Sequence, residues 1–247
     1  MSDLRTFIAS PSLPDGAQIT VFGLTTVGFA VAARVVRGVT TAGAVAGGAV
    51  CFLLMLAACW GGFAAVCTVF VMTWAATRVG YRRKQQIGSA ERHSGRNAGQ
   101  VWANLGVPAV AALLYIWMHD PRFLLCIAAA LSEVTADTLS SEIGTFLGGT
   151  PRLVTTWKAV APGTDGAITW VGSLVALFAA LVVASVCAVT NVFAVRMIPK
   201  CVAAAILGTL VDSLLGATLE RRGVLRNNGV NFLSTAAAAT VAWFIAN

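Results

Sequence analysis

Apolar runs of about 20 residues, separated by short polar stretches, repeat along almost the whole chain. A helical run of that length spans the hydrocarbon core of a bilayer, which is about 30 Å thick. The stretch between Arg37 and Arg78 holds no charge and is too long for one span, so we place a break at the CWGG of residues 59–62. The pattern then predicts eight helices, near residues 19–36, 41–58, 62–79, 100–118, 122–140, 167–189, 201–219 and 230–246.

The composition strengthens this prediction. Of the 247 residues 57% are hydrophobic and 11% are charged, and the mean hydropathy is +0.80, whereas soluble domains carry about 25% charged residues. We predict an all-α, polytopic integral membrane bundle of about seven or eight transmembrane helices, forming one domain over residues 1–247. Residues 1–18 are a polar N-terminal segment, too polar for a signal peptide. The six cysteines lie in apolar runs without a CxxC pair, which predicts buried thiols and disfavours a zinc site.

The net charge of +7 is unevenly distributed, because basic residues gather in alternate loops. The densest cluster lies between Arg78 and Arg96. Cytoplasmic loops of membrane proteins carry an excess of Lys and Arg, so this pattern predicts the cytoplasmic side and argues against a nucleic-acid partner. Residues 80–99 are then a basic cytoplasmic loop, and residues 141–166 a cytoplasmic active-site loop. We expect a protein of the cell membrane or an organelle inner membrane with its active site on the cytoplasmic face.

Three acids stand within ten residues in the stretch SEVTADTLSSEIG, residues 132–144. Glu133 and Asp137 are four residues apart and so share one face of the predicted helix, while Glu142 lies nearer the water boundary. Asp137 would lie roughly 22 Å along that helix, in the cytoplasmic half of the membrane.

A second predicted helix carries acids to a similar depth. Asp212 would lie roughly 18 Å from the outer end of that helix, and Glu220 follows eight residues later on the same face. Carboxylates facing lipid are costly, so the acids of the two helices should face a shared, wet interior. Mg²⁺ prefers such hard oxygen ligands, which favours a divalent-cation site. The alternative is an ion pair of Asp137 or Asp212 with a neighbouring Arg.

Three further stretches carry groups suited to phosphate or nucleotide. The segment 151–172 combines basic and hydroxyl side chains with the glycines of PGTDG, which let backbone N–H groups approach an anion, although PGTDG is also typical of a plain turn. Gln100 and Asn104 begin a helix, where they could bind phosphate or base or simply hydrogen-bond between helices. NNGVNFL begins the last helix, with Asn228 either its N-cap or a ligand.

Taken together, ADTLSSEIG, PRLVTTWKAVAPGTDGAITWVGSL, DSLLGATLE and NNGVNFL, in that order, resemble the membrane-protein family of transmembrane protein 19 and the plant plastid phytyl-phosphate kinase. The resemblance covers nearly the whole chain. A more distant similarity extends to dolichol kinases and CDP-diacylglycerol synthases. The first motif departs from the Trp- or Ala-bearing version expected, but it keeps its acids.

The resemblance implies Mg²⁺-dependent transfer of a phosphoryl group from a nucleoside triphosphate, commonly CTP, to a prenyl monophosphate such as phytyl or geranylgeranyl phosphate. The expected partners are the prenyl phosphate lipid, the nucleotide and the bilayer, with homodimerisation left open. The catalytic residues would be Asp137, Lys158 and Asp212, and the metal ligands Glu133, Asp137, Glu142, Asp212 and Glu220. The nucleotide and phosphate contacts would be Arg96, Gln100, Asn104, Arg152, Thr155, Lys158, Gly163, Thr164, Asp165, Gly166, Asn228 and Asn231.

Other functions remain open from the sequence. A prenyl alcohol kinase would use the same ligands but need a general base, for which Glu133 and Asp137 are the candidates. A CTP-dependent cytidylyltransferase would share the ligands and release pyrophosphate. A cation-coupled transporter, from another class of protein, is also marked by acids within the membrane.

Overall fold

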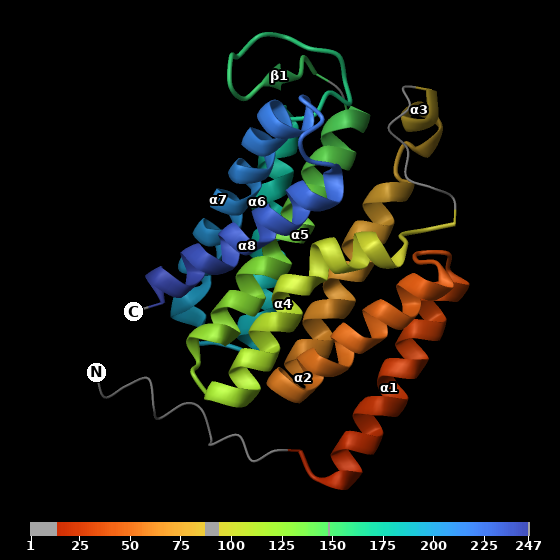
Figure 1. Cartoon of the computed structure of the whole chain (residues 1–247), viewed down its shortest axis with the longest axis vertical. Helices are drawn as coiled ribbons and strands as arrows, with labels where there is room; N and C mark the ends of the chain where they lie inside the picture. The colour runs from red at the N-terminus through yellow and green to blue at the C-terminus, as the bar shows by residue number, and fades with distance from the viewer. Residues whose placement is uncertain (1–13, 87–93, 148, 247) are drawn as a thin grey trace.

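A bundle of long helices makes up the computed structural model, which describes residues 14–86, 94–147 and 149–246 (Figure 1). The described residues form eight α-helices: α1 Gly16–Val35, α2 Thr41–Arg78, α3 Tyr81–Gln86, α4 Ala98–Met118, α5 Arg122–Leu147, α6 Trp170–Val189, α7 Ile198–Leu215 and α8 Asn227–Ile245. The two-residue strands β1 (Arg152–Leu153) and β2 (Ala167–Ile168) pair antiparallel. The predicted all-α membrane bundle is therefore confirmed. Residues 1–13 of the polar N-terminal segment and 87–93 of the basic loop lie outside the described residues.

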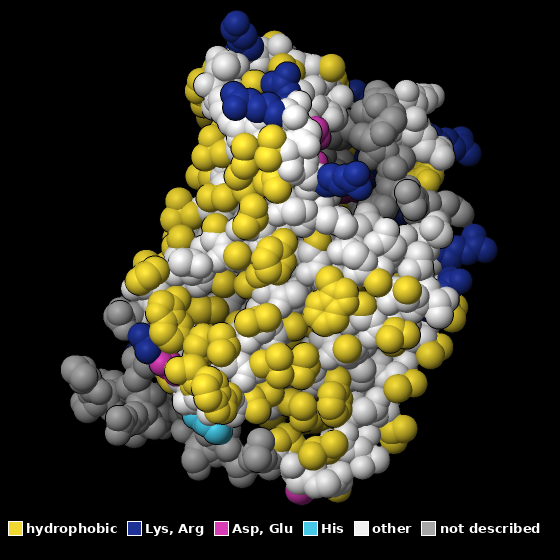
Figure 2. All heavy atoms as spheres, viewed as in Figure 1, with side chains coloured by type: hydrophobic (Ala, Val, Ile, Leu, Met, Phe, Trp, Pro, Cys, Tyr) yellow, Lys and Arg dark blue, Asp and Glu magenta, His cyan; other side chains and the backbone are white. Residues whose placement is uncertain are grey.

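Six of the helical segments in the described part of the chain are long and apolar enough to cross a membrane: α1, α2, α4, α5, α6, and Val195–Glu220, which contains α7. Figure 2 shows hydrophobic side chains along the flank of the bundle, while most Lys and Arg side chains gather toward the end that carries α3 and β1. A flank in contact with acyl chains and a basic end in contact with water account for this distribution.

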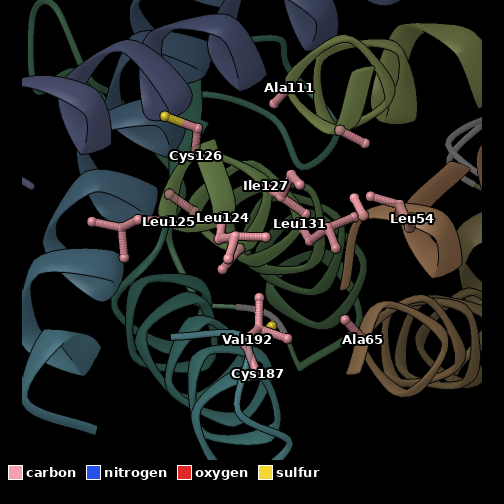
Figure 3. Packing of buried hydrophobic residues seen from close by; sticks show 14 of the residues in the cluster. Leu54, Ala65, Ala111, Leu124, Leu125, Cys126, Ile127, Leu131, Cys187 and Val192 are labelled. Carbon is pink, nitrogen blue, oxygen red and sulfur yellow. The ribbon is translucent and has the colours of Figure 1, made fainter. Parts of the chain in front are cut away.

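The centre of the bundle is α5, which packs against α2, α4, α6, α7 and α8. From Phe123 to Leu131 this helix is apolar all round and buried, as expected of a helix enclosed by other helices. Figure 3 shows the core around this part of α5, with contributions from α2, α4 and α6. The labelled residues of this cluster are Leu54, Ala65, Ala111, Leu124, Leu125, Cys126, Ile127, Leu131, Cys187 and Val192.

The start of α5 is fixed by Asp120, whose carboxylate accepts hydrogen bonds from the backbone N–H of Arg122 at 2.9 Å and from its guanidinium. These hydrogen bonds hold the pKa of Asp120 below its usual value. The Arg122 guanidinium lies over the ring of Trp243 in α8, 3.9 Å from its centroid. Helix α5 extends past the predicted end at residue 140 to Leu147, so both Asp137 and Glu142 are helical.

Helix α2 is a hairpin of two helical legs, as the predicted break requires. Ala58 and Cys59 have non-helical dihedrals, with a positive φ of 49° at Cys59. The chain reverses so tightly that a Cβ built on Gly62 would lie 2.2 Å from the carbonyl oxygen of Leu54. A Cβ built on Gly61 would lie 2.7 Å from Cγ2 of Val192 in the α6–α7 connection. Glycine at these positions therefore allows the turn.

The prediction of buried thiols is confirmed for Cys51, Cys126, Cys187 and Cys201. It is wrong for Cys59, which is exposed because it lies in the reversal of α2. No disulfide links the cysteines, all six of which belong to the described residues.

Substituting Gly62 tests the hairpin. Gly62→Ala should lower the free energy of unfolding by about 1–3 kcal/mol, the size of an overpacking penalty, because its Cβ would overlap the Leu54 carbonyl. The matched control is Gly28→Ala in α1, where no atom lies within 4 Å and the higher helix propensity of Ala should be neutral or favourable. Thermal unfolding in detergent measures both variants, and equal melting temperatures would contradict the tight reversal.

Candidate active site

Two carboxylates from different helices meet near the basic end of the bundle. Asp137 of α5 and Asp212 of α7 lie within side-chain hydrogen-bonding distance of each other. Glu133, one turn earlier on α5, is buried and close enough to Asp212 for electrostatic repulsion, and its Oε2 accepts a hydrogen bond from Thr235 Oγ1 of α8 at 3.0 Å. Glu133 and Asp137, four residues apart on α5, therefore face the same interior position as Asp212 of α7.

Small residues allow these helices to approach. A Cβ on Gly208 of α7 would lie 2.7 Å from Cγ of Glu133 and 2.9 Å from the carbonyl oxygen of Ser234. Glycine at this position lets α5, α7 and α8 pack against one another, as small residues do in membrane bundles. Glu133 is thereby held within the three-helix contact.

The donor set at this junction fits a hard divalent cation. Asp212 Oδ2 and Glu133 Oε1 are buried and have no hydrogen-bond partner among the described residues. Neither Asp137 nor Asp212 forms an ion pair among the described residues, although Arg96 attracts Asp137 electrostatically. Within the same residues no three His, Cys, Asp or Glu side chains form a ready-made metal cage. A bound Mg²⁺ would therefore take one or two carboxylates and complete its shell with phosphate oxygens and water, as it commonly does.

These aspartates lie at a polar cleft of about 520 Å³ between α5, α6, α7 and the segment 149–169. Besides glycine backbone, the cleft wall offers the hydroxyls of Ser140, Ser141 and Thr169. Eight of the residues singled out from the sequence line this one cleft: Asp137, Glu142, Gly163, Thr164, Asp165, Gly166, Asp212 and Glu220.

The PGTDG turn reaches the cleft because the β1–β2 ribbon folds it back onto the end of α7. Gly166 has a positive φ of 72°, and a Cβ there would lie 2.2 Å from the backbone nitrogen of Ala217. Ala217 belongs to the π-helical turn Gly216–Glu220 that ends α7. Glycine is thus required at position 166 by both conformation and space. Asp165 is in turn close enough to Glu220 to repel it.

The other half of this ribbon does not reach the cleft. Arg152, Thr155 and Lys158 are exposed and are not among the residues that line it. The Arg152 guanidinium donates to the carbonyl oxygen of Trp157 at 2.8 Å. The structure therefore separates these proposed phosphate contacts from Asp137 and Asp212.

The amide side chains mostly serve the helices themselves. Gln100 forms a capping box with Asn97, and Asn104 Oδ1 accepts a hydrogen bond from Asn231 Nδ2 at 3.1 Å, which joins α4 to α8. Asn228 is exposed and is not the N-cap, because α8 begins at Asn227 and Arg226 precedes it. Arg96 lies in a second cavity and donates to Thr73 Oγ1 at 3.2 Å.

Sequence reasoning missed Lys84 and Asn227, which both line the cleft. Lys84 is almost completely buried, pairs with Glu142, and donates to the carbonyl oxygens of Ala76 and Thr77 at 3.0 Å. In the sequence Lys84 is one of several basic residues in one short polar stretch, and nothing distinguishes it there from its neighbours. Asn227 is part of NNGVNFL, where position alone did not distinguish it from Asn228.

The chain is similar to several curated membrane proteins. It is 33% identical to the uncharacterised membrane protein MJ0933 of Methanocaldococcus jannaschii over 67% of this chain and 68% of that protein. It is 32% identical to protein VTE6, chloroplastic, of Arabidopsis thaliana over 73% of this chain and 57% of that protein. Protein PGR of Arabidopsis thaliana is 30% identical over 76% of this chain and 83% of its own length.

No solved structure matches the chain. The model of one protein family, described as integral membrane protein DUF92, matches residues 24–239. That match includes both legs of α2, the acidic helix α5, the PGTDG turn and the start of α8, and the relatives cover two thirds or more of the chain. The chain therefore belongs to the DUF92 family of integral membrane proteins.

Proposed function

We propose that this protein is a membrane prenyl-phosphate kinase, which transfers a phosphoryl group from a nucleoside triphosphate such as CTP to a prenyl monophosphate. The observation that carries the proposal is the meeting of Asp137 and Asp212 with the PGTDG turn at one polar cleft of an apolar bundle. Membership of the DUF92 family and the motif resemblance to phytyl-phosphate kinase support the same activity.

Phosphoryl transfer suits this cleft because the reaction depends mainly on positioning and on neutralisation of charge. Mg²⁺, when bound, supplies the neutralisation of the nucleotide phosphates. Asp137 and Asp212 would hold the ion, since both side chains line the cleft and lie close to each other, and Asp212 Oδ2 has no hydrogen-bond partner among the described residues. The backbone N–H groups of the turn 163–166 would donate to phosphate oxygens.

The acceptor needs little activation. An oxygen of the prenyl monophosphate attacks the γ-phosphorus of the nucleotide, and the bond from that phosphorus to the β–γ bridging oxygen breaks. The nucleoside diphosphate leaves with the bonding electron pair, and the prenyl diphosphate is formed. The acceptor phosphate is already an anion at neutral pH, so no side chain has to remove a proton. We place this reaction on the cytoplasmic face, because the cleft lies toward the basic end of the bundle.

The products of the purified protein test this assignment. Incubation with MgCl₂, geranylgeranyl phosphate and each of four nucleoside triphosphates should give geranylgeranyl diphosphate and a nucleoside diphosphate, identified by mass spectrometry. Pyrophosphate with a cytidylylated lipid would instead mark a cytidylyltransferase, and turnover of geranylgeraniol alone a prenyl alcohol kinase. Either result, or uptake of a cation into proteoliposomes without lipid turnover, would overturn the proposal.

Single substitutions test the carboxylate pair. Asp137→Asn and Asp212→Asn should each lower kcat by about 100-fold or more, the size expected when one preorganised electrostatic contact is lost. Each should also reduce the rise in melting temperature that MgCl₂ and CTP cause, because metal binding is weakened. The matched control is Asp120→Asn at the opposite end of α5, which removes the same charge away from the cleft. Near-normal kcat in either variant, with a melting curve like that of the parent, would exclude its metal role.

A further inference from the structure

A second cavity, of about 320 Å³, lies between α1, the two legs of α2 and α4, separate from the polar cleft. Its walls are mostly apolar, and Val134 is the residue that α5, the helix of Asp137, contributes to them. The lining apolar residues include Phe29, Ala30, Val66, Phe70, Val101 and Leu105.

The mouth of this cavity is cationic. Arg37, Arg78 and Arg96 line it together with Tyr81, and no Asp or Glu is among its described lining residues. Arg78 stacks on Trp74, 4.1 Å from the ring centroid, and donates to the carbonyl oxygen of Val36 at 2.6 Å. These contacts hold the guanidinium at the rim. An apolar cavity with a positive rim is complementary to an amphiphile that has an anionic head and an apolar chain.

The two cavities meet at α5. Val134 lines the apolar cavity, and Asp137, one helical turn later, lines the polar cleft. Arg96 bridges them, because it lines the apolar cavity and is close enough to Asp137 to attract its carboxylate. An anionic head at Arg96 would therefore lie next to the carboxylates of the proposed phosphoryl-transfer site.

We propose that the apolar cavity binds the prenyl chain of the acceptor, with its monophosphate at Arg96, and that the wall at Gly47 determines which chain lengths are accepted. This inference rests on the proposed function and adds the acceptor subsite and its selectivity to it. The prenyl chain enters from the rim and runs between the α2 legs, and its far end meets the wall that Gly47 of α2 forms with residues of α1 and α4.

A substitution at Gly47 can change which prenyl chain lengths the cavity accepts without disturbing the helices. A Cβ on Gly47 would meet only Cγ1 of Val101, at an ordinary contact distance of 3.9 Å, so a side chain there enters the cavity. Gly43 is unsuitable, because its Cβ would lie 2.4 Å from the carbonyl oxygen of Arg96. Ala30 lines the cavity from the α1 side and gives a second, independent position.

The variants Gly47→Leu and Ala30→Leu test the proposal through kcat/KM for geranyl, farnesyl and geranylgeranyl phosphates. Each should lower kcat/KM for the longest acceptor by about 10-fold or more relative to geranyl phosphate, because a few displaced methylene groups in an apolar pocket change selectivity by that amount. The KM for the nucleotide should stay within about two-fold. The matched control is Gly28→Leu, which adds the same side chain to an exposed position of α1.

A binding experiment separates failure of this inference from failure of the proposed function. Photocrosslinking with a geranylgeranyl phosphate that carries a diazirine at its far end, without nucleotide, should label peptides of α1, α2 or α4, and Gly47→Leu should reduce that labelling. Labelling confined to other helices, or equally competed by phosphatidate, would overturn the subsite even if the kinase activity is found. Labelling of these peptides in a protein with no kinase activity would retain the subsite and refute the proposed function alone. A fall in kcat/KM of Gly47→Leu that is equal for all three acceptors would also overturn the proposed subsite.

Discussion

The close approach of Asp137 and Asp212 inside an apolar bundle is the constraint on which the surrounding structure depends. Two ionised carboxylates at this distance repel each other, and their burial removes the water that would screen them. The arrangement is stable only if a cation or a proton lies between the oxygens. Helices α5 and α7 must also be held together against that repulsion, and the glycines at 208 and 216 allow close packing on both sides of the pair.

Helix α5 links this pair to the rest of the bundle. Its first half is buried among apolar neighbours from five helices, which fixes its axis, and its second half places polar side chains along the cleft. The buried ion pair of Lys84 with Glu142 joins the end of α5 to the α3 segment. A buried pair of this kind contributes little net stability but is costly to break, so it favours one relative position of the two segments.

Much of the fold could be predicted because its signals are local. The eight apolar runs and the break near residues 59–62 follow from length, hydropathy and two consecutive glycines, and the structure has them all. The proximity of Asp137 to Asp212 follows from their similar depth in two spans. The sequence could not predict which side of the 151–169 ribbon faces the cleft. That orientation depends on how β1 pairs with β2 and on the close packing of Gly166 against Ala217. The role of Lys84 likewise depends on a partner 58 residues away.

The two cavities differ in their distribution of charge, and under the proposed function this difference suits each to a different ligand. Among its described lining residues the polar cleft carries five carboxylates and one lysine, which is already paired, so a nucleotide would need a bound cation to be attracted there. The apolar cavity carries three arginines and no acid among its described lining residues, so under the proposed function it would attract the lipid phosphate through these side chains. Under the proposed function, a lipid phosphate would therefore bind without metal, whereas the nucleotide would need a metal ion to bind with it. Arg96 of the apolar cavity and Asp137 of the polar cleft attract each other, so the lipid phosphate and the nucleotide would bind at adjacent positions. The repulsion between these two anions would then be reduced by the metal ion that binds with the nucleotide.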